Sequence, residues 1–309
     1  MAEFRPGTAD QAAFLADLIG RGLLLDTGVP GLYGRSGDFE DVREGVADLV
    51  THAVASEEPE RMRFPPVLPR RDLETVGYLK SFPHLAGSIF AFRGDESQAA
   101  EQYDRASRHE DWSEHQGMTD LVLTPAACYP VYPVVAARGR LAARGVTIDA
   151  GGAYVFRHEP SGDPARMQIF HQREIVRIGE PEVVAEWREQ WRDRAVVLLG
   201  ELGLDVQLEV ATDPFFGRSG RMLAASQREQ ELKFEVTVQI AGPEPTAVAS
   251  FNYHQDHFAS AYGIEACEGG AHTACLGFGL ERIALALFRT HGLEIDSWPV
   301  DVRAKVLGR

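Results

Sequence analysis

The sequence has few cysteines, no long apolar run and no excess of positive charge. Its three cysteines, Cys128, Cys267 and Cys275, are odd in number and too sparse for a disulfide framework, which fits a reducing compartment. No apolar run approaches the length of a membrane span, and the N-terminus lacks the basic-then-apolar pattern of a signal peptide. We therefore expect a cytoplasmic protein with no membrane partner, in which the cysteines are free thiols or metal ligands.

The charge balance is strongly acidic, with a formal net charge of −15 at pH 7. Broad, non-specific nucleic-acid binding is therefore not expected, because contacts to phosphates need a basic surface. With 44% hydrophobic residues, the chain is able to bury a substantial core. The densest basic group consists of Arg61, Arg63, Arg70 and Arg71. It is either a solvated loop edge or a docking patch for an acidic partner.

Apolar periodicity predicts a short helical section at the N-terminus. Apolar residues recur at helical spacing over 12–19 and over 39–50, and the glycine-containing segment 28–37 between them predicts a loop. We expect a helical section at residues 1–59 and a larger domain at 60–309, or one continuous domain.

The larger part alternates between strand-like and helical stretches. Paired prolines after residue 60 predict extended segments with turns, and the polar stretch 95–118 predicts a surface helix. A wide apolar face over 183–202 predicts a long core helix that ends at Gly203. Strands with hairpin-length connections after a helix favour an antiparallel sheet and an α+β fold. The strand-like segments are 204–214, 231–242 and 246–255, with a loop predicted over 215–227.

Residues 154–179 alternate apolar and polar side chains on both sides of a polar loop at 160–164, which predicts a β-hairpin. Side chains two residues apart on a strand share a face. We expect one face to carry an arginine, two carboxylates and an aromatic ring, which suits an anionic, planar ligand. The residues of this face are Arg157 and Glu159, then Phe170, Gln172 and Glu174, with Arg166 at the loop edge.

Two stretches of the sequence combine glycines or aromatic residues with an arginine: FRHE at 156–159 and GFGLER at 277–282. They resemble motifs 2 and 3 of class II aminoacyl-tRNA synthetases of seryl type, and the region 61–69 is similar to motif 1. The resemblance covers roughly residues 60–290. It implies a catalytic domain in which an antiparallel sheet is flanked by helices, and a homodimer, because class II enzymes pair through motif 1.

The resemblance implies that a carboxylate is activated by ATP, with cations fixed where negative charge develops on the α-phosphate. Arg157 would hold the α-phosphate and the substrate carboxylate, and Arg282 would clamp the γ-phosphate. Catalysis would consist mostly of positioning and electrostatics, without a covalent enzyme intermediate. Arg166 would contact the pyrophosphate, Phe170 and Arg282 would stack on the adenine, and Glu159 would accept from the adenine amine. Ser250 and Glu235 would lie near Mg²⁺, with Glu235 in place of the acid expected at Ala247.

Cys128, Glu174 and Cys275 form a candidate zinc site. Cys128 ends the sequence LTPAAC, which lies where seryl enzymes carry an element that holds the amino group. Two cysteines and a carboxylate leave one tetrahedral position open, which a substrate amino group could fill. The substrate side would be completed by Ala126, Arg157, Glu159 and Asn252. Cys267 is interpreted as a spare thiol, and His254 with His257 as a rival metal pair or as substrate-side or structural polar residues.

The long N-terminal coiled coil with which seryl-tRNA synthetases grip tRNA has no counterpart, because only short helical patterns precede residue 60. In this absence and in its cysteine pair, the sequence resembles the amino acid:[carrier protein] ligases. That resemblance implies activation of glycine or alanine to an aminoacyl-adenylate and transfer to the phosphopantetheine thiol of a small acidic carrier protein, with tRNA not the expected acceptor. Candidate docking residues are the arginines at 61–71 with Arg138, Arg140 and Arg144.

Two other functions stay open. A zinc-dependent aminoacyl-tRNA synthetase of seryl type would carry out the same activation and then charge tRNA. A non-catalytic, synthetase-like binding or regulatory module would activate nothing, although the intact Arg157, Arg166 and Arg282 argue against it.

Overall fold

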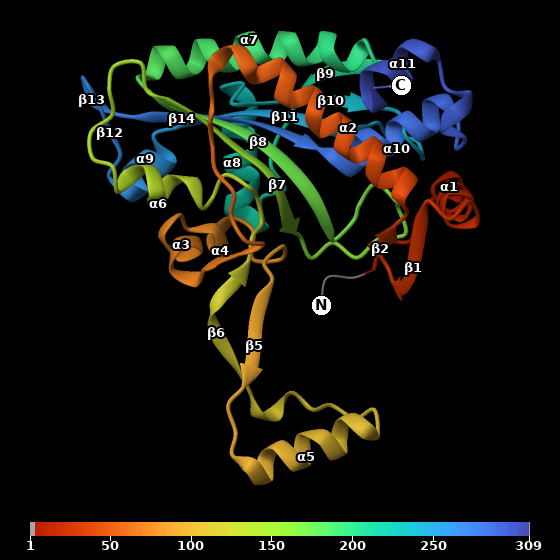
Figure 1. Ribbon diagram of the computed structural model, residues 1–309. Coiled ribbons are helices and arrows are strands. Elements are labelled where there is room, and N and C mark those ends of the chain that lie inside the picture. Colours follow the sequence, from red (N-terminus) through yellow and green to blue (C-terminus); the bar gives the residue numbers. More distant parts are fainter. Residues whose placement is uncertain (1–3, 309) are drawn as a thin grey trace.

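A seven-stranded sheet forms the centre of the protein (Figure 1). The computed structural model describes residues 4–308, and the sheet confirms the expected α+β class. Neighbouring strands are antiparallel, except for a short parallel pairing at one edge. In spatial order the strands are β3 (Glu60–Arg61), β7 (Val146–Phe156), β8 (Ile169–Gly179), β14 (His272–Gly279), β11 (Thr246–Gln255), β10 (Lys233–Val238) and β9 (Val206–Val210).

Helices cover both faces of this sheet, and the alternation of side chains along a strand divides the core between them. Ile175 of β8 packs in one apolar cluster, whereas its neighbour Val176 packs in the other. The first cluster includes α1 (Ala9–Gly20), α2 (Gly37–Val54), α7 (Pro181–Gly200), α10 (Leu280–His291) and α11 (Val300–Leu307). The second includes α3 (Arg70–Thr75), α4 (Tyr78–Ser81), α6 (Val131–Ala136) and α9 (His257–Tyr262).

The long helix α7 confirms the predicted core helix. It begins with Pro181 in its first turn, where the missing N–H has no intrahelical partner to lose, and buries Trp187 and Trp191 against the sheet. Its last residue is Gly200, so the helix ends slightly earlier than expected. Gly203 lies just beyond it with a φ of 75°, which a side chain rarely adopts.

The N-terminal section contains the two predicted helices, α1 and α2, but the segment between them was wrongly predicted as a loop. It forms a hairpin of β1 (Leu24–Val29) and β2 (Leu32–Arg35). Gly28 and Gly31 have φ values of 78° and 76° near its turn. The glycines therefore make a tight hairpin turn possible, where the sequence pattern indicated only a break between helices.

Two further predictions need correction. The surface helix expected over 95–118 is α5 (Glu96–Ser107), and the chain then turns at His109, with a φ of 58°. The loop expected over 215–227 is instead the helix α8 (Gly217–Glu229). Gly220 allows this helix to begin close to Phe215, because a Cβ atom there would lie 2.7 Å from the Phe215 carbonyl carbon. Of the two glycines of α8, Gly220 thus permits close packing, whereas Gly217 has a φ of 74° and open space around it.

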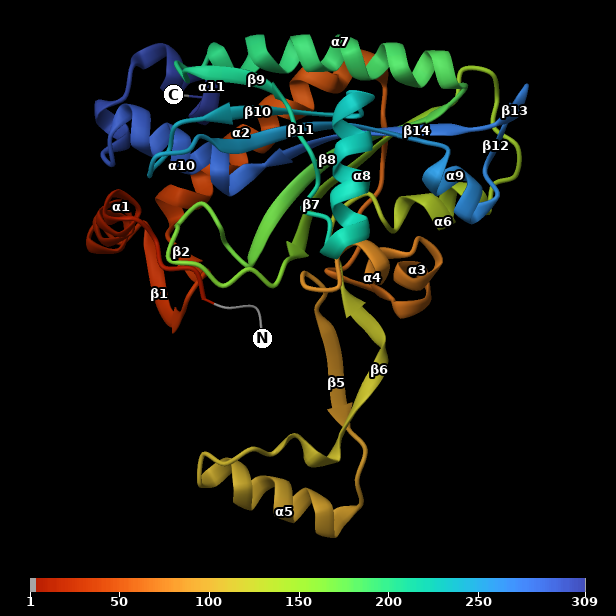
Figure 2. The same ribbon diagram turned by 180° about the vertical axis from the view of Figure 1, so that it is seen from behind.

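A long arm extends away from the sheet (Figures 1 and 2). It consists of β5 (Ser88–Phe92), α5 and β6 (Gln116–Leu123), and β6 also pairs with β4 (Val67–Pro69). Phe90 is 56% exposed on this arm, and Phe92, Met118 and Leu121 are also exposed. The remaining short elements are β12 (Glu265–Ala266), β13 (Gly269–Gly270), η1 (Ala55–Glu57), η2 (Ser113–His115) and η3 (Ile295–Ser297).

No helix within the described residues is both long and apolar enough to cross a bilayer.

Candidate active site

A cavity of about 470 Å³ opens against the face of β8, β14 and β11. Pairing register brings the three strands' side chains together, because Gly277 of β14 lies opposite both Glu174 and Ser250. Gly277 has to be small there, since a Cβ atom would lie 3.1 Å from both Ser250 Oγ and Gln172 Nε2. The predicted site residues that line the cavity are Ala126, Cys128, Arg157, Phe170, Glu174, Ser250, Asn252, Cys275 and Arg282.

The predicted hairpin exists, but its first strand is displaced relative to the prediction. β7 begins at Val146 and ends at Phe156, so Arg157 and Glu159 lie in the loop that follows and not on the strand. The return strand β8 has the predicted faces, with Phe170, Gln172 and Glu174 all directed into the cavity. The loop of residues 157–168, called the arginine loop below, therefore carries the arginines of this region.

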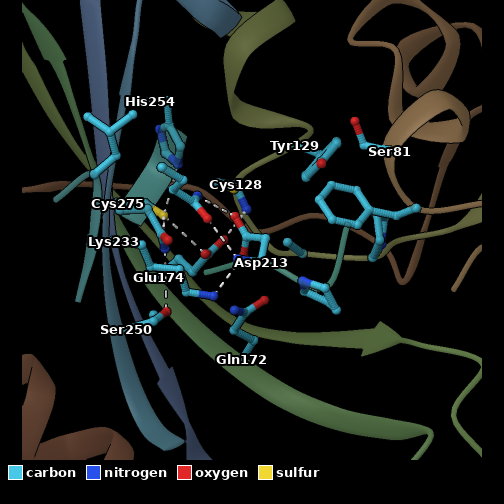
Figure 3. Close-up of a pocket in the computed structure, with 18 of the residues that line it drawn as sticks. Ser81, Cys128, Tyr129, Gln172, Glu174, Asp213, Lys233, Ser250, His254 and Cys275 are labelled. Carbon is cyan, nitrogen blue, oxygen red and sulfur yellow. Dashed lines mark hydrogen bonds and ion pairs between the residues drawn. The ribbon is translucent and has the colours of Figure 1, made fainter. Parts of the chain in front are cut away.

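One end of the cavity is a buried cluster of two thiols and a carboxylate (Figure 3). The ligand atoms of Cys128, Glu174 and Cys275 all lie within 4.8 Å of one another, and each residue is at most 3% exposed. Glu174 accepts hydrogen bonds from the backbone N–H of Cys128 and from Cys275 Sγ, the latter at 3.4 Å. These are the three residues that the sequence analysis grouped as a candidate zinc site, and the structure brings their ligand atoms together.

Protonation of this cluster is favoured when no cation is bound. The hydrogen bond with Cys275 and burial raise the pKa of the Cys128 thiol, and burial raises the pKa of Glu174. A divalent cation reverses this preference, because it stabilises the deprotonated forms of its ligands. The donor set and its burial therefore fit a zinc ion.

His254 lies beside the cluster, with Nε2 at 3.5 Å from Cys275 Sγ and Nδ1 at 3.0 Å from Thr273 Oγ1. Burial lowers the pKa of His254 to about 3, so the imidazole is neutral. His257 also lines the cavity, but the two histidines do not form a second metal cluster among the described residues. Cys267 is exposed and contacts the carbonyl of Leu141, away from the other thiols.

Arginines form the other end of the cavity. Arg282 is anchored by two backbone carbonyls, donating from Nε to Ala165 at 2.8 Å and from Nη1 to Ala247 at 2.9 Å. Burial, together with the nearby charges of Arg157 and Arg166, lowers the pKa of Arg282 to about 10. The Arg157 guanidinium carbon lies 5.6 Å from the centre of the Phe170 ring. This crowding of like charges favours an anionic ligand here.

Three predicted ATP contacts lie outside the cavity wall. Arg166 is half-exposed, 3.9 Å from Glu159 and 3.7 Å from Asp163 in weak ion pairs. Glu235 pairs with Lys233 at 3.0 Å and lies opposite Ser250 in the sheet. The structure therefore brings Arg166, Glu159 and Glu235 to the border of the site.

An ion pair that the sequence analysis missed holds α8 against the cavity. Lys233 Nζ lies 2.7 Å from Asp213 Oδ1, and Gln227 of α8 donates to Asp213 Oδ2 at 2.8 Å (Figure 3). Burial alone would lower the pKa of Lys233, but the carboxylates of Asp213 and Glu235 raise it above its usual value. The alternation of Lys233 and Glu235 on one strand was the available signal, whereas Asp213 lies in a proline-containing loop without a pattern.

The arginines proposed for docking are mostly engaged in ion pairs. Arg138 pairs with Glu60 at 2.6 Å and Arg140 with Glu265 at 2.6 Å. Arg63 and Arg70 also have carboxylate partners, at 3.4 Å and 3.3 Å. In contrast, α8 presents exposed arginines for which no ion pair is found within the described part of the chain, namely Arg218, Arg221 and Arg228.

Comparison with known proteins identifies relatives that match most of the chain, although no protein-family model matches it. Amino acid–[acyl-carrier-protein] ligase 2 of Bradyrhizobium diazoefficiens is 45% identical over 306 residues, which cover 98% of this chain and 89% of the relative. Ligase 1 of the same organism is 44% identical, with 96% and 91% covered. A type-2 serine–tRNA ligase from Methanopyrus kandleri is 27% identical over 208 residues, which are 60% of this chain and 37% of that protein.

Solved structures show the same architecture. A structure of M. kandleri SerRS in complex with A. aeolicus tRNASec has a TM-score of 0.79 at 20% identity, covering 98% of this chain and 61% of that one. Giardia lamblia prolyl-tRNA synthetase in complex with prolyl-adenylate has a TM-score of 0.69 at 15% identity, covering 96% and 56%. At these identities the likeness concerns the fold alone, and it confirms the class II synthetase fold.

Proposed function

The chain belongs to the amino acid–[acyl-carrier-protein] ligase family, and we propose that it joins a small amino acid to the phosphopantetheine thiol of a carrier protein through an aminoacyl-adenylate. In the first step a carboxylate oxygen attacks the α-phosphate of ATP and pyrophosphate leaves. In the second step the thiol attacks the acyl carbon and AMP leaves. The observation that carries the proposal is the single cavity with a thiol–carboxylate cluster at one end and converging arginines at the other.

Cys128, Glu174 and Cys275 are proposed to hold zinc, supported by their burial and mutual distances. The ion would bind the amino group of the amino acid and so fix its position. Asn252 lies 3.5 Å from Cys275 Sγ and 3.4 Å from Ser250 Oγ, so it would border the substrate next to this end. Ala126 borders the same cavity.

The arginine end is proposed to bind ATP with Mg²⁺. Arg157 lines the cavity next to the Phe170 ring, where it would meet both the substrate carboxylate and the α-phosphate. Fixed cations at this point stabilise the charge that develops as pyrophosphate leaves. The other proposed contacts are Arg282 and Arg166 to the phosphates, Phe170 and Glu159 to the adenine, and Glu235 and Ser250 near Mg²⁺.

The amino acid is proposed to be glycine or alanine. Space beside the cluster is limited by Gln172 and Ser250, because even a Cβ atom on Gly277 would lie 3.1 Å from Gln172 Nε2 and from Ser250 Oγ. Gln172 is itself fixed, because its Oε1 accepts from the backbone N–H of Ala127 at 3.3 Å. A small side chain fits such a wall better than a bulky one.

The carrier protein is proposed to dock at α8 in place of the arginines predicted from the sequence. Phe215, Leu223 and Gln227, on or next to this helix, line the cavity, and the exposed Arg218 and Arg221 lie on it. Exposed arginines on a helix that also lines the cavity suit a small acidic partner. Arg221→Glu is expected to reduce transfer to the carrier about 10-fold while ATP–pyrophosphate exchange stays unchanged. Arg144→Glu serves as the comparison, and equal transfer by both variants would contradict docking at α8.

A homodimer is proposed from the resemblance to motif 1. The arm adds support, since Phe90, Met118 and Leu121 are exposed on a hairpin that has little apolar cover of its own. We also propose that residues 1–59 are continuous with the catalytic domain, because Phe14 and Phe39 share the core of α7 and α10.

The deciding experiment offers the zinc-loaded protein ATP with each amino acid, followed by tRNA and phosphopantetheinylated carrier protein side by side. The proposal predicts exchange with a small amino acid and a thioester on the carrier. Charging of tRNA instead would favour a seryl-type synthetase, for which the 27% identical relative gives some support. Absence of exchange with every amino acid would leave only a non-catalytic module.

A further inference from the structure

The arginine loop is held from outside by two segments that precede it by more than a hundred residues in the chain. Polar loops of this kind usually lie on the surface and move. Here Ser161 and Asp163 are 3% and 7% exposed, and Ala165 is also buried. The segment of residues 5–7 and the turn of the β1–β2 hairpin contact this loop from outside.

The first support is a short backbone pairing. The N–H of Arg5 donates to the Pro160 carbonyl at 3.1 Å, and the N–H of Gly162 donates to the Arg5 carbonyl at 3.0 Å. Arg5 and Ser161 thereby form a parallel bridge. Gly7 continues the contact, because a Cβ atom on it would lie 2.8 Å from the Gly162 carbonyl oxygen. The two backbones therefore touch without room for a side chain.

The second support is the hairpin turn. The N–H of Gln168 donates to the Gly31 carbonyl at 2.7 Å, and Gln168 Nε2 donates to the Pro30 carbonyl at 2.9 Å. A Cβ atom on Gly31 would lie 3.1 Å from the carbonyl oxygen of Arg166. The turn thus contacts the backbone of the residue whose side chain is proposed to meet the pyrophosphate.

On the inner side the loop is connected to the cavity through Arg282, which donates to the Ala165 carbonyl at 2.8 Å. Within the loop, Asp163 Oδ1 accepts from the N–H of Ala165 at 2.9 Å. A displacement of the loop would therefore move both Arg166 and the anchor of Arg282.

We propose that residues 5–7 and the turn at Pro30 and Gly31 form an outer brace that positions the arginine loop for the phosphates of ATP. The brace touches no substrate and acts only through Arg166 and Arg282. This inference rests on the proposed function for its kinetic test, because it assigns the loop to ATP. Since the thiol–carboxylate cluster has no contact with the brace among the described residues, amino-acid binding is expected to be insensitive to it.

The test uses paired glycine variants of the full-length protein. Gly31→Ala and Gly28→Ala both place a side chain at positive φ in the same hairpin, but only the first meets the loop, because the space around Gly28 is open. ATP–pyrophosphate exchange is expected to show an ATP KM about 10-fold higher for Gly31→Ala than for Gly28→Ala. The KM for the amino acid is expected to stay within about 2-fold.

Gly7→Ala gives the same test at the other support. Its control is Gly20→Ala, because no atom lies within 4 Å of a Cβ at Gly20. If Gly31→Ala does not fold, this second pair carries the test. Equal ATP KM values within both pairs, or a parallel rise of both substrates' KM, would overturn the brace.

A second measurement separates failure of the brace from failure of the proposed function. Trypsin is expected to cut after the half-exposed Arg166 several-fold faster in Gly31→Ala than in Gly28→Ala, whether or not the protein activates amino acids. Faster cutting without any exchange in the wild type would keep the brace and remove the assignment to ATP. If trypsin cuts Gly31→Ala and Gly28→Ala at the same rate, and the wild-type protein does carry out exchange, the brace proposal alone is wrong.

Discussion

Cys128, Glu174 and Cys275 are at most 3% exposed, whereas Arg166, which borders the arginine end of the cavity, has a side chain that is 45% exposed. Glu174 and Cys275 lie within paired strands whose register fixes them. Arg157 and Arg166 lie in a loop, and Arg282 lies at the start of a helix. Arg157 and Arg282 donate to backbone carbonyls, whereas Arg166 has only long ion pairs with Glu159 and Asp163. The thiol–carboxylate end is thus specified largely by the sheet itself, whereas the arginine end depends on contacts from other parts of the chain.

The largest expected effect comes from a change in the buried thiol–carboxylate cluster. Cys128→Ser is expected to reduce exchange at least about 100-fold and to lower the zinc content, because a ligand of the cluster is lost. Cys267→Ser is the matched control, since Cys267 is an exposed thiol outside the cluster and its loss is expected to change neither quantity. Exchange by Cys128→Ser above one tenth of the wild-type rate would show that this end is less important than its burial indicates.

At the arginine end, Arg282→Lys keeps the charge but loses the two anchoring hydrogen bonds from Nε and Nη1. We expect kcat/KM for ATP to fall about 100-fold with the zinc content unchanged. Arg289→Lys is the control, because Arg289 is exposed on the same helix and pairs with Asp10. A loss of zinc in Arg282→Lys would contradict the independence of the two ends.

Gly277 lies between the ends and is expected to give an intermediate effect. In Gly277→Ala the added methyl group would lie 3.1 Å from Ser250 Oγ and from Gln172 Nε2, and 3.4 Å from Glu174 Oε1. It would therefore press on all three side chains. The KM for the amino acid should rise about 10-fold, and the ATP KM should rise less. Gly200→Ala, at the end of α7, has only one neighbour at 4.0 Å and should change neither. A larger effect on ATP than on the amino acid would assign Gly277 to the other end.

The smallest effect concerns stability at the junction with α8. Burial alone would raise the pKa of Asp213, but Lys233 lowers it below its usual value. A carboxyl group with a lowered pKa stabilises the fold above its unfolded pKa of about 3.9, and this contribution is lost as the pH falls through the folded pKa. For Lys233, whose pKa is raised, the contribution is present below about 10.4 and is lost at higher pH.

Asp213→Asn is therefore expected to lower the free energy of unfolding by roughly 1–3 kcal/mol at pH 7. The difference from wild type should shrink below about pH 3.9. Urea denaturation at several pH values measures it. Asp296→Asn is the control, because the Asp296 side chain is 97% exposed and only 4.0 Å from its partner Arg303. A pH-independent difference would mean that the Asp213 charge is not what stabilises the junction.

The contrast between the ends also explains what the sequence could predict. Phe170, Gln172 and Glu174 alternate on β8, and strand periodicity alone places them on one face. The cysteines could be grouped with Glu174 only through the resemblance to known enzymes, because Cys128 lies in a loop and Cys275 on a different strand.

Other features depend on contacts between distant segments and left no local pattern. The hairpin between α1 and α2 and the helix α8 were both predicted as loops from their glycines. In each case glycine permits a positive φ or a close approach, and only the folded chain reveals which. The support of the arginine loop by residues 5–7 could not be predicted, because backbone groups make this contact and no side-chain pattern marks it.

Strand β8 connects the two ends of the cavity. Phe170 and Glu174 lie four residues apart on one face, which is about 13 Å along a strand. For the proposed reaction, the cluster would hold the nitrogen of the substrate and Arg157 would hold its carboxylate. Arg157 lies in the arginine loop but packs against the Phe170 ring, so the sheet and the loop together would set the distance between the two groups. Selection would then act on backbone length as well as on side-chain size. β-Alanine, with one more carbon between its amino and carboxyl groups, should be rejected although it is no bulkier than alanine.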